Sequence, residues 1–347
     1  MSYILGLDIG GANIKACRFC SLGTRSASVY HEVWRDPWGI KDVLEEIKTE
    51  LREGEPEAVA LTMTAELCDV FDSKAQGVLC VLSQVEEAFG GVLIHVWTID
   101  GKFLPVGETR ESPLKAAASN WLAGAQMLAS CLAARQEQTI LIDIGSTTTD
   151  ILPIAPGKVL AAGRTDIQRL AAGELVYTGA QRTTLNSIVD NVYLDGALCR
   201  VANEHFAITA DVYRYLGLIT EDEYTVPTPD GAGRAPKDCA KRIARLVAGE
   251  PEEIGHEKIR LLAEYIMEKQ LQQIMDGIWQ VASRNGICAE ELVITGEGAF
   301  LAELAARRLN RKTLRWHELV PGAGPEPAMA SFAVAWLLHH WGKDRLI

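Results

Sequence analysis

The chain has 347 residues, of which 48% are hydrophobic and 23% are charged, as expected of a globular protein large enough for two domains and a substantial core. The formal net charge is −12 at pH 7, and no run of Lys or Arg offsets it, so we expect no nucleic-acid partner. The first residues enter a strand pattern directly, and no apolar stretch is long enough to span a membrane. We therefore expect a cytoplasmic protein without a membrane partner.

The eight cysteines are scattered along the chain, and only Cys17 and Cys20 have a CxxC spacing. Without a second Cys or His pair nearby, we expect buried free thiols and no zinc site. His205, His256 and His317 show no ligand spacing, and no Ser-His-Asp, HExxH or P-loop pattern is present.

Near the start of the chain, a short apolar run reaches Asp8, a glycine turn follows, and a second apolar run begins. This pattern, YILGLDIGGANIKACRF over Tyr3–Phe19, predicts a buried strand, a tight turn and a second strand. The stretch Thr139–Ile154, TILIDIGSTTTDILPI, repeats it with Asp143 in the place of Asp8. Two such strand pairs predict a duplicated domain with an anion site between its halves.

The two turns carry the chemistry expected of a phosphate site. Glycine lets a phosphate approach the main chain, and free N–H groups in such turns bind oxyanions. A carboxylate at a strand end cannot hold phosphate itself, so Asp8 and Asp143 predict Mg²⁺ ligands or groups that polarise a nucleophile. A single copy slightly favours an ordinary tight turn, whereas the repetition favours function. The predicted phosphate-binding residues are Gly10, Gly11, Asn13, Lys15, Gly145, Ser146, Thr147 and Thr148.

Strands and helices alternate through the rest of the first half. The apolar strand Ala58–Met63 is followed by Thr64 and Glu66, and ligands bind at such strand ends in open α/β sheets. Glu66 is therefore a candidate catalytic residue, and a charge at the start of a helix is the plain alternative. The other predicted elements of this half are strands over 26–34 and 92–97 and helices over 38–53, 74–89 and 114–134.

The second half continues with the repeated strand pair and then becomes less regular. Asp150 lies one step into the second strand of that pair, where a buried carboxylate needs a partner, and it is a candidate catalytic residue. The pattern is weak from Arg164 to Gly179, and 182–187 and 189–198 fit strands or loops equally. The stretch Thr220–Pro236 predicts a surface loop that could act as a lid. Helices are predicted over 203–216, 238–248, 256–284, 300–309 and 328–340, with a strand over 292–294.

A third glycine turn, Thr295-Gly296-Glu297-Gly298-Ala299, lies between the last predicted strand and a helix. Helix N-termini bind anions and nucleotides, so Gly296 and Gly298 are candidate cofactor-binding residues. Alone this signal is weak, because many strand–helix connections use glycine. As the third such turn, it completes a pattern.

A guanidinium can pair two phosphate oxygens, so four arginines are candidates for a diphosphate clamp. Each of them by itself is more typical of a surface residue or an ion pair. They are Arg110, Arg164, Arg182 and Arg234.

With its three turns in this order, the chain resembles the actin/hexokinase-type superfamily of sugar and acid kinases. GLDIGGANIK is similar to the first phosphate loop of that superfamily, LIDIGSTTTDI to the second, and VITGEGAF to the adenosine-type turn. The resemblance implies an α/β fold of duplicated actin-like, ribonuclease H-like domains with mixed sheets and an interdomain cleft. We expect the first domain over 1–135 and the second over 139–327, with a C-terminal helix over 328–347 that can pack back on the first.

Segments between Leu61 and Leu218 carry a closer resemblance, among them TMTAELCDVFDSKAQGV, IDIGSTTTDILPI and GELVYTGAQRT. They resemble hydantoinase/oxoprolinase-related proteins linked to tetrahydromethanopterin C1 transfer. This resemblance implies a transferase of methanofuran or methylofuran biosynthesis, which joins a furanmethyl diphosphate to the phenol of a tyrosine- or tyramine-type acceptor and releases diphosphate. In such an enzyme, Mg²⁺ held by Asp8 and Asp143 would stabilise the leaving diphosphate, and a carboxylate such as Asp150 or Glu66 would accept the phenol proton.

Two alternatives remain open at this point. One is an ATP-dependent small-molecule kinase on the same scaffold, for which ATP would be the cofactor. The other is a non-catalytic nucleotide-sensing or assembly subunit. The acceptor is also open between tyrosine, tyramine and a glutamylated form, and so is the oligomeric state, with a homodimer as one expectation.

Overall fold

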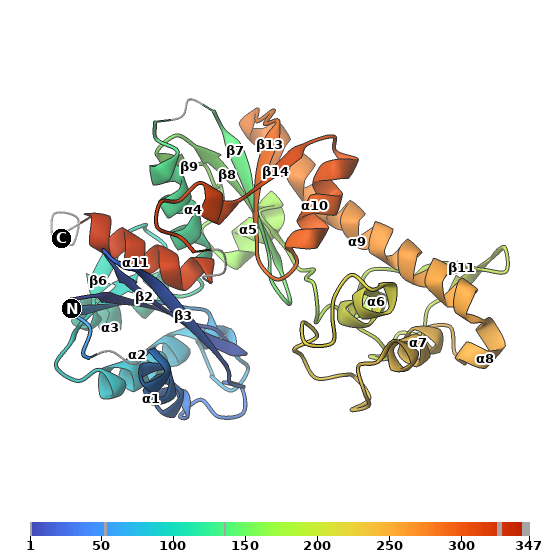
Figure 1. The fold of residues 1–347 in the computed structure, drawn as a ribbon, viewed down its shortest axis with the longest axis horizontal. Helices are drawn as coiled ribbons and strands as arrows, with labels where there is room; N and C mark the ends of the chain where they lie inside the picture. The colour runs from blue at the N-terminus through green and yellow to red at the C-terminus, as the bar shows by residue number, and fades with distance from the viewer. Residues whose placement is uncertain (1, 52–53, 135–136, 325–327, 342–347) are drawn as a thin grey trace.

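The computed structural model describes residues 2–51, 54–134, 137–324 and 328–341, and its core is a pair of mixed β-sheets (Figure 1). The first sheet has the strand order β3-β2-β1-β4-β5-β6, and the second has β10-β8-β7-β13-β14, with β9 paired to β8. The strands of the first sheet are β1 (Ile4–Ile9), β2 (Asn13–Cys20), β3 (Gly23–Tyr30), β4 (Ala58–Met63), β5 (Leu93–Trp97) and β6 (Phe103–Pro105). Those of the second are β7 (Thr139–Ile144), β8 (Thr149–Ala155), β9 (Lys158–Val159), β10 (Leu175–Val176), β13 (Glu291–Thr295) and β14 (Lys312–Arg315).

The two sheets have the same topology around their first strands. β1 pairs antiparallel with β2 and parallel with β4, and β7 pairs in the same way with β8 and β13. With β3 and β5 outside in one sheet, and β9 and β14 outside in the other, both have the order third-second-first-fourth-fifth when β10 is left aside. This repetition confirms the predicted α/β fold of duplicated actin-like domains with mixed sheets.

Alternation along β1 sends its side chains into two different layers. Leu5, Leu7 and Ile9 pack with helices α1 (Ile40–Leu51) and α2 (Lys74–Ala88). Ile4 faces the opposite way, into a cluster with helices α4 (Asn120–Cys131) and α11 (Met329–Trp341). Gly6 permits the close approach of α11, because a Cβ there would overlap the carbonyl oxygen of Ser331. Helix α11 therefore lies directly on the first sheet.

The second sheet is layered in the same way. Ile140, Ile142 and Ile144 of β7 pack with the long helix α9 (His256–Asn285) and with α10 (Ala299–Arg308). Leu141 instead belongs to the cluster of α4 and α11. These two helices thus form a layer between the two sheets, and apolar residues of both sheets are buried against it.

A helical lobe extends away from the second sheet along α9, on the right in Figure 1. It contains α6 (Thr209–Leu216), α7 (Pro236–Arg245), α8 (Pro251–Ile254) and a hairpin of β11 (Asn191–Leu194) and β12 (Ala197–Arg200). Two short helices complete the fold, α3 (Val106–Glu111) beside the first sheet and α5 (Asp166–Ala172) before β10.

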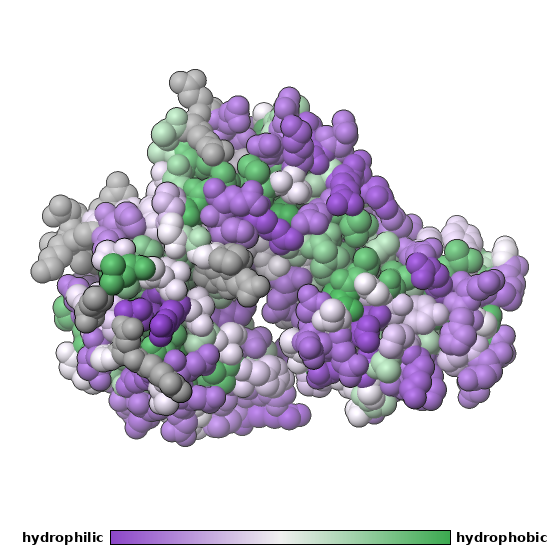
Figure 2. Space-filling view, in the orientation of Figure 1, coloured by the Kyte–Doolittle hydropathy of each residue, from purple (hydrophilic) through white to green (hydrophobic). Residues whose placement is uncertain are grey.

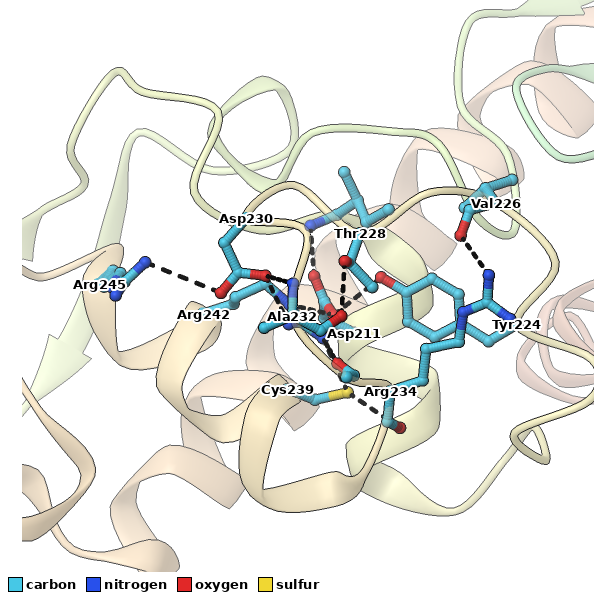
Figure 3. A network of polar contacts seen from close by, with 12 residues as sticks. Asp211, Tyr224, Val226, Thr228, Asp230, Ala232, Arg234, Cys239, Arg242 and Arg245 are labelled. Carbon is cyan, nitrogen blue, oxygen red and sulfur yellow. Dashed lines mark hydrogen bonds and ion pairs between the residues drawn. The ribbon is translucent and has the colours of Figure 1, made fainter. Parts of the chain in front are cut away.

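A buried ion-pair network anchors the connection between α6 and α7 (Figure 3). Arg242 donates to Asp211 at 2.8 Å and to Asp230 at 2.9 Å. Asp211 also accepts a hydrogen bond from the Tyr224 hydroxyl at 3.0 Å. The predicted loop is free of helix and strand over 220–235, as expected. It is not only a surface loop, however, because the Tyr224 side chain is fully buried and Asp230 ties the loop to α7.

The structure corrects or completes the predicted elements in several places. The strand expected over 26–34 ends at Tyr30, and the helix expected from 203 begins at Thr209. The helix expected from Leu114 begins at Asn120, because Ala118 has a φ of 46°, which a right-handed helix does not allow. Helix α5 lies in the stretch of weak pattern, where the capping box of Thr165 and Gln168 is the signal that would have predicted it. The short edge strand β14 was not predicted.

All eight cysteines lie within the described residues and are free thiols, as expected. Cys17, Cys80 and Cys239 are buried as expected, whereas Cys288 is exposed. Among the described residues, no helix combines the length and the apolar character needed to cross a bilayer.

Candidate active site

Strand periodicity places four of the predicted residues on the inner faces of the two sheets. Asp8 lies on the face of β1 that packs on α11, and its antiparallel partner on β2 is Lys15. Asp143 lies on the corresponding face of β7, and its partner on β8 is Asp150. Both pairs therefore face the layer formed by α4 and α11. The duplication gives an Asp–Lys pair in one half and an Asp–Asp pair in the other.

A pocket with about 300 Å³ of empty space, part of it open to solvent, lies at this layer. Its polar walls include Asp143 and Asp150 of the second sheet and Asn120 at the start of α4. The remaining walls are Trp121, Gly124, Leu141, Leu152, Met329 and Ala330. The pocket is thus apolar on most sides and carboxylate-lined on one.

Asp8 is a buried carboxylate with an unused acceptor. It is 8% exposed, and its Oδ1 has no hydrogen-bond partner within the described part of the chain. Burial raises the pKa of Asp8 to about 6, against the opposing effects of the Lys15 charge and a hydrogen bond from Asn120. Asp8 is therefore available to a cation or a proton.

Asp143 has the more perturbed environment of the two. Burial raises the pKa of Asp143 to about 7, and the neighbouring Asp150 and Asp8 charges add to the effect while Lys15 opposes it. A carboxyl with a pKa near neutrality is a typical feature of catalytic and cation-binding sites. The effect of the Asp150 and Asp8 charges on the pKa of Asp143 agrees with their positions on facing strands of the two sheets.

Asp150 has a partner that sequence reasoning missed. Arg169 of α5 forms a hydrogen-bonded ion pair with Asp150, and it also donates to the carbonyl oxygen of Glu174 at 3.2 Å. The Arg169 guanidinium carbon lies 4.2 Å from the centre of the Trp121 ring, in a cation–π contact. Arg169 is almost fully buried and pairs with Asp150, which also lines the pocket.

Glu66 lies apart from the residues that line this pocket. Its side chain is buried, its Oε1 accepts from the backbone N–H of Ala118 at 2.7 Å, and its Oε2 has no partner among the described residues. Burial raises the pKa of Glu66 to about 7, opposed by that hydrogen bond and by the Lys74 charge. Ala118 is the residue with positive φ just before α4. By accepting its N–H, Glu66 fixes the segment that places Asn120 beside Asp8.

The two predicted phosphate-binding turns, 10–12 and 145–148, are closed by equivalent hydrogen bonds. Gly10 N–H donates to the Asn13 carbonyl at 3.0 Å, and Gly145 N–H donates to the Thr148 carbonyl at 2.9 Å. In Figure 1 both turn ends point towards the centre of the molecule. Figure 2 shows a recess in this region of the surface, between the first half and the helical lobe. The structure therefore brings the predicted phosphate-binding turns towards one another.

The third turn packs directly against the second. Gly298 N–H donates to the Ile144 carbonyl at 2.8 Å, and Gly296 has a φ of 89°. A Cβ at Gly296 would lie 2.5 Å from the Asp143 Oδ1, so close packing alone requires glycine there. The Glu297 carboxylate accepts from the Gln181 side chain at 2.8 Å. The second and third turns therefore meet beside Asp143.

The four candidate clamp arginines have different surroundings. Arg110 forms an ion pair with Glu86, Arg164 donates to the Ile99 carbonyl at 3.1 Å, and Arg234 donates to the Val226 carbonyl at 3.3 Å. The backbone N–H of Arg182 donates to the Ser146 carbonyl at 2.8 Å. Of the four, Arg182 is the one bonded to a phosphate turn.

The predicted metal ligands do not form a preassembled cage. Within the described residues, no group of three or more His, Cys, Asp or Glu is arranged to hold a metal ion. Asp8 and Asp143 fit the simpler way in which Mg²⁺ is held, by one or two carboxylates plus water and substrate phosphates. The free Oδ1 of Asp8 is the observation that supports this fit.

Comparison with known protein families gives one match over most of the chain. A model described as hydantoinase/oxoprolinase matches residues 57–330. Two archaeal relatives are named as synthases of a furan-2-yl methanamine that carries a glutamylaminoethyl-phenoxymethyl group. The Methanocaldococcus jannaschii protein is 35% identical over 96% of this chain and 97% of its own. The Methanococcus vannielii protein is 34% identical over 50% of this chain and 76% of its own.

Solved structures give a likeness of fold. A nucleotide-free acetone carboxylase, described in terms of ATP-dependent acetone carboxylation, has a TM-score of 0.59 at 11% identity, over 96% of this chain and 70% of that one. A ROK-family glucokinase from Streptomyces griseus has a TM-score of 0.46 at 15% identity, over 96% and 98% of the two chains. At this identity the likeness to the carboxylase concerns the fold alone.

Proposed function

The chain belongs to the hydantoinase/oxoprolinase family, and we propose that it is an ether-forming synthase of methanofuran or methylofuran biosynthesis. It would join a furanmethyl diphosphate to the phenol of a tyrosine- or tyramine-type acceptor and release diphosphate. The name of the relatives supports this reaction, because a phenoxymethyl-furan contains an ether between a phenol oxygen and a methyl carbon on the furan ring. The observation that carries the proposal is the pair of equivalently bonded turns whose strands direct Asp8 and Asp143 towards the same layer of α4 and α11.

The reaction balances without an oxidant or a nucleotide. The bond between the furanmethyl carbon and the diphosphate oxygen breaks, and its electron pair leaves on diphosphate. The phenol oxygen bonds to the same carbon and loses its proton. Because a furanmethyl cation is stabilised by its ring, the protein mainly has to bind and neutralise the leaving group.

Neutralisation needs positive charge, because Asp8, Asp143 and Asp150 would repel a bare diphosphate. Lys15 faces the same space and lowers the pKa of Asp143 through its charge. Mg²⁺ bound by Asp8 and Asp143 would supply the remaining positive charge at the departing diphosphate. The N–H groups of the turns at Gly10, Gly11, Gly145 and Ser146 would orient its oxygens.

Asp150 is the better placed of the two candidate proton acceptors. It lines the pocket, whereas Glu66 does not. Asp150 is paired with Arg169, and a phenol oxygen that has already bonded to carbon is strongly acidic and needs only a weak base. Glu66 would then act through the segment at Ala118 and remains the second candidate for the proton.

The test is incubation of the protein with the furanmethyl diphosphate, Mg²⁺ and tyrosine, tyramine or glutamyl-tyramine. We expect an ether product by mass spectrometry together with an equal amount of released diphosphate. In Asp8→Asn and Asp143→Asn variants, turnover should fall by about 100-fold or more, as for loss of an electrostatic group in a transition state. If wild-type protein forms neither product with any of the three acceptors, the proposal is wrong.

The position of the third turn favours one alternative, an ATP-dependent small-molecule kinase. Gly296 and Gly298 pack against Asp143 and Ile144, so the second and third turns are adjacent, as binding of one adenosine phosphate by both turns requires. The same assay with ATP in place of the furan diphosphate separates the two functions. ADP and a phosphorylated acceptor, without any ether product, would favour the kinase.

A further inference from the structure

Arg182 and Trp34 connect the two phosphate turns from opposite halves of the molecule. The backbone N–H of Arg182 donates to the carbonyl oxygen of Ser146 in the second turn at 2.8 Å. On the other side, Trp34 follows Val33, whose N–H donates to the carbonyl oxygen of Gly11 in the first turn at 3.0 Å. The guanidinium carbon of Arg182 lies 5.0 Å from the centre of the Trp34 ring. Their contact therefore joins the segments that are bonded to the two turns.

The guanidinium of Arg182 has its hydrogen-bonding capacity unused. Within the described residues it has the Trp34 ring as its contact and no hydrogen bond or ion pair. The other three candidate arginines each donate to a carbonyl oxygen or a carboxylate. An arginine has five N–H donors in a planar fork, which suits two oxygens of one phosphate group.

The charges around Arg182 agree with a position above the first turn. Its charge lowers the pKa of Cys68, against burial and the nearby acidic charges, which raise it. The Cys68 sulfur would lie 3.0 Å from a Cβ added at Gly11, so this thiol lies against the first turn. Arg182 is thus bonded to the second turn through its backbone, and its side chain lies near Trp34 and Cys68 beside the first turn.

On the basis of the proposed function, we propose that Arg182 binds the diphosphate of the donor and that Trp34 holds the guanidinium in place for it. The carboxylates of Asp8 and Asp143 repel the diphosphate, so a cation that approaches from the opening strengthens binding. A free arginine side chain would lose rotamer freedom on binding, and this loss weakens affinity. An arginine already held on a ring face avoids part of the loss. Trp34 is thus a positioning residue, and Arg182 contacts the substrate.

The test uses the full chain and inorganic diphosphate as the probe, with and without Mg²⁺, in isothermal titration calorimetry. Arg182→Ala should weaken diphosphate binding by about 10- to 100-fold, the usual effect of losing hydrogen bonds from a charged group. Arg182→Lys should recover part of this loss, because it keeps the charge but not the fork. Arg25→Ala is the matched control. Arg25 is an exposed arginine near the start of β3, and the variant removes the same charge as Arg182→Ala.

Two Trp34 variants test the positioning role. Trp34→Phe keeps a ring face and should bind diphosphate within about 3-fold of wild type, whereas Trp34→Ala should lose about 3- to 10-fold. Thermal unfolding of each variant shows whether a loss of binding follows from a loss of folding. If a variant with Ala is unstable, the Lys and Phe variants still compare binding in folded protein.

The outcomes separate this proposal from the proposed function. If Arg182→Ala binds diphosphate as tightly as Arg25→Ala does, or wild-type protein does not bind diphosphate, the role of Arg182 is wrong. If Trp34→Ala binds like wild type, the positioning role of Trp34 is wrong. If wild-type protein binds diphosphate in an Arg182-dependent way but forms no ether, the synthase proposal fails and this one stands.

Discussion

The carboxyl of Asp143 makes folding depend on pH in a direction that can be predicted. Its pKa is raised to about 7 from an ordinary 3.8, so the folded state holds this proton more tightly than the unfolded state. Between about pH 4 and 7 the contribution of Asp143 to the free energy of unfolding therefore falls as the pH rises, and above pH 7 the full penalty applies. Asp143→Asn removes the penalty. We expect this variant to gain about 1–2 kcal/mol relative to wild type at pH 8, a discounted value because solvent still reaches Asp143, and little at pH 4.5.

Urea unfolding of both proteins across this pH range measures the difference. Asp222→Asn, which changes an exposed carboxylate in the loop before α7, is the control and should follow wild type at every pH. A constant difference between wild type and Asp143→Asn from pH 4.5 to 8 would contradict the assigned pKa. Loss of stability at pH 8 would do the same.

Mg²⁺ should compete with the protons on Asp8 and Asp143. Because the pKa values of these carboxyls are raised to about 6 and about 7, both are largely ionised at pH 8 and largely protonated at pH 5. Metal binding requires the ionised form, so Mg²⁺ should raise the melting temperature clearly at pH 8 and only slightly at pH 5. A thermal-shift titration with MgCl₂ measures this effect. It should disappear in Asp8→Asn and persist in Asp222→Asn, and equal shifts in these two variants would indicate nonspecific ion binding.

At the scale of elements, the contact of α11 with β1 depends on one missing side chain. Gly6→Ala places a Cβ on the backbone of α11 at Ser331, and backbone atoms cannot move aside as a flexible side chain can. We expect a loss of about 1–3 kcal/mol in the free energy of unfolding, measured by urea unfolding, as for overpacked cores. Gly107→Ala in α3 is the matched control, because a Cβ there meets nothing within 4 Å. It should be neutral or stabilise by about 0.4–1 kcal/mol. Equal midpoints for the two variants would mean that α11 does not pack this closely.

The sequence could predict the elements that repeat, because a strand that alternates between two buried layers shows its period directly. Asp8 and Asp143 each end an apolar run, are the fifth residue of a six-residue strand and precede the same type of turn, so the pattern predicts their equivalent positions. The partner of Asp150 could not be predicted in this way. Arg169 lies 19 residues further along the chain, on a helix of weak pattern, and its contact with Trp121 depends on how α4 packs on the second sheet. Such contacts are set by tertiary packing, which one sequence does not specify locally.

The helical lobe shows the same limit more strongly. Asp211 and Arg242 look like ordinary surface charges of two amphipathic helices, yet both side chains are completely buried. Their pairing depends on the angle between α6 and α7 and on a loop that returns Tyr224 and Asp230 to the same place. Sequence patterns predict well which apolar residues are buried, but they do not predict which charged residues are buried with them.

At the scale of the whole molecule, the loop before α7 is connected to the turns of the site. The Gln181 side chain accepts from the backbone N–H of Thr225 at 3.0 Å and donates to Glu297 of the third turn at 2.8 Å. Its backbone N–H donates to the Ser146 carbonyl of the second turn at 3.0 Å. A loop anchored by the buried network around Arg242 is therefore linked, through Gln181, to two of the three turns. The anchoring of this loop should therefore influence the site.

Replacing Arg242 tests whether the buried network anchors this loop. Arg242→Ala leaves the Asp211 carboxyl buried without its main partner, and breaking such a pair costs about 3–5 kcal/mol. Burial already raises the pKa of Asp211 against the Arg242 charge, so in the variant this carboxyl should take up a proton more readily, which limits the cost at low pH. The loss of stability in urea should therefore be smaller at pH 5 than at pH 8.

The control is Arg245→Ala one helical turn away, whose side chain is 52% exposed and lies 3.9 Å from Asp230. An exposed pair of this kind contributes about 0–1 kcal/mol, so this variant should unfold close to wild type. Limited proteolysis should cut the 220–235 loop faster in Arg242→Ala than in Arg245→Ala, because the first loses the bonds that hold Asp230 and the Gly233 carbonyl. If the two variants unfold and are cut alike, the buried network does not anchor the loop, and the link from the helical lobe to the turns must depend on Gln181 alone.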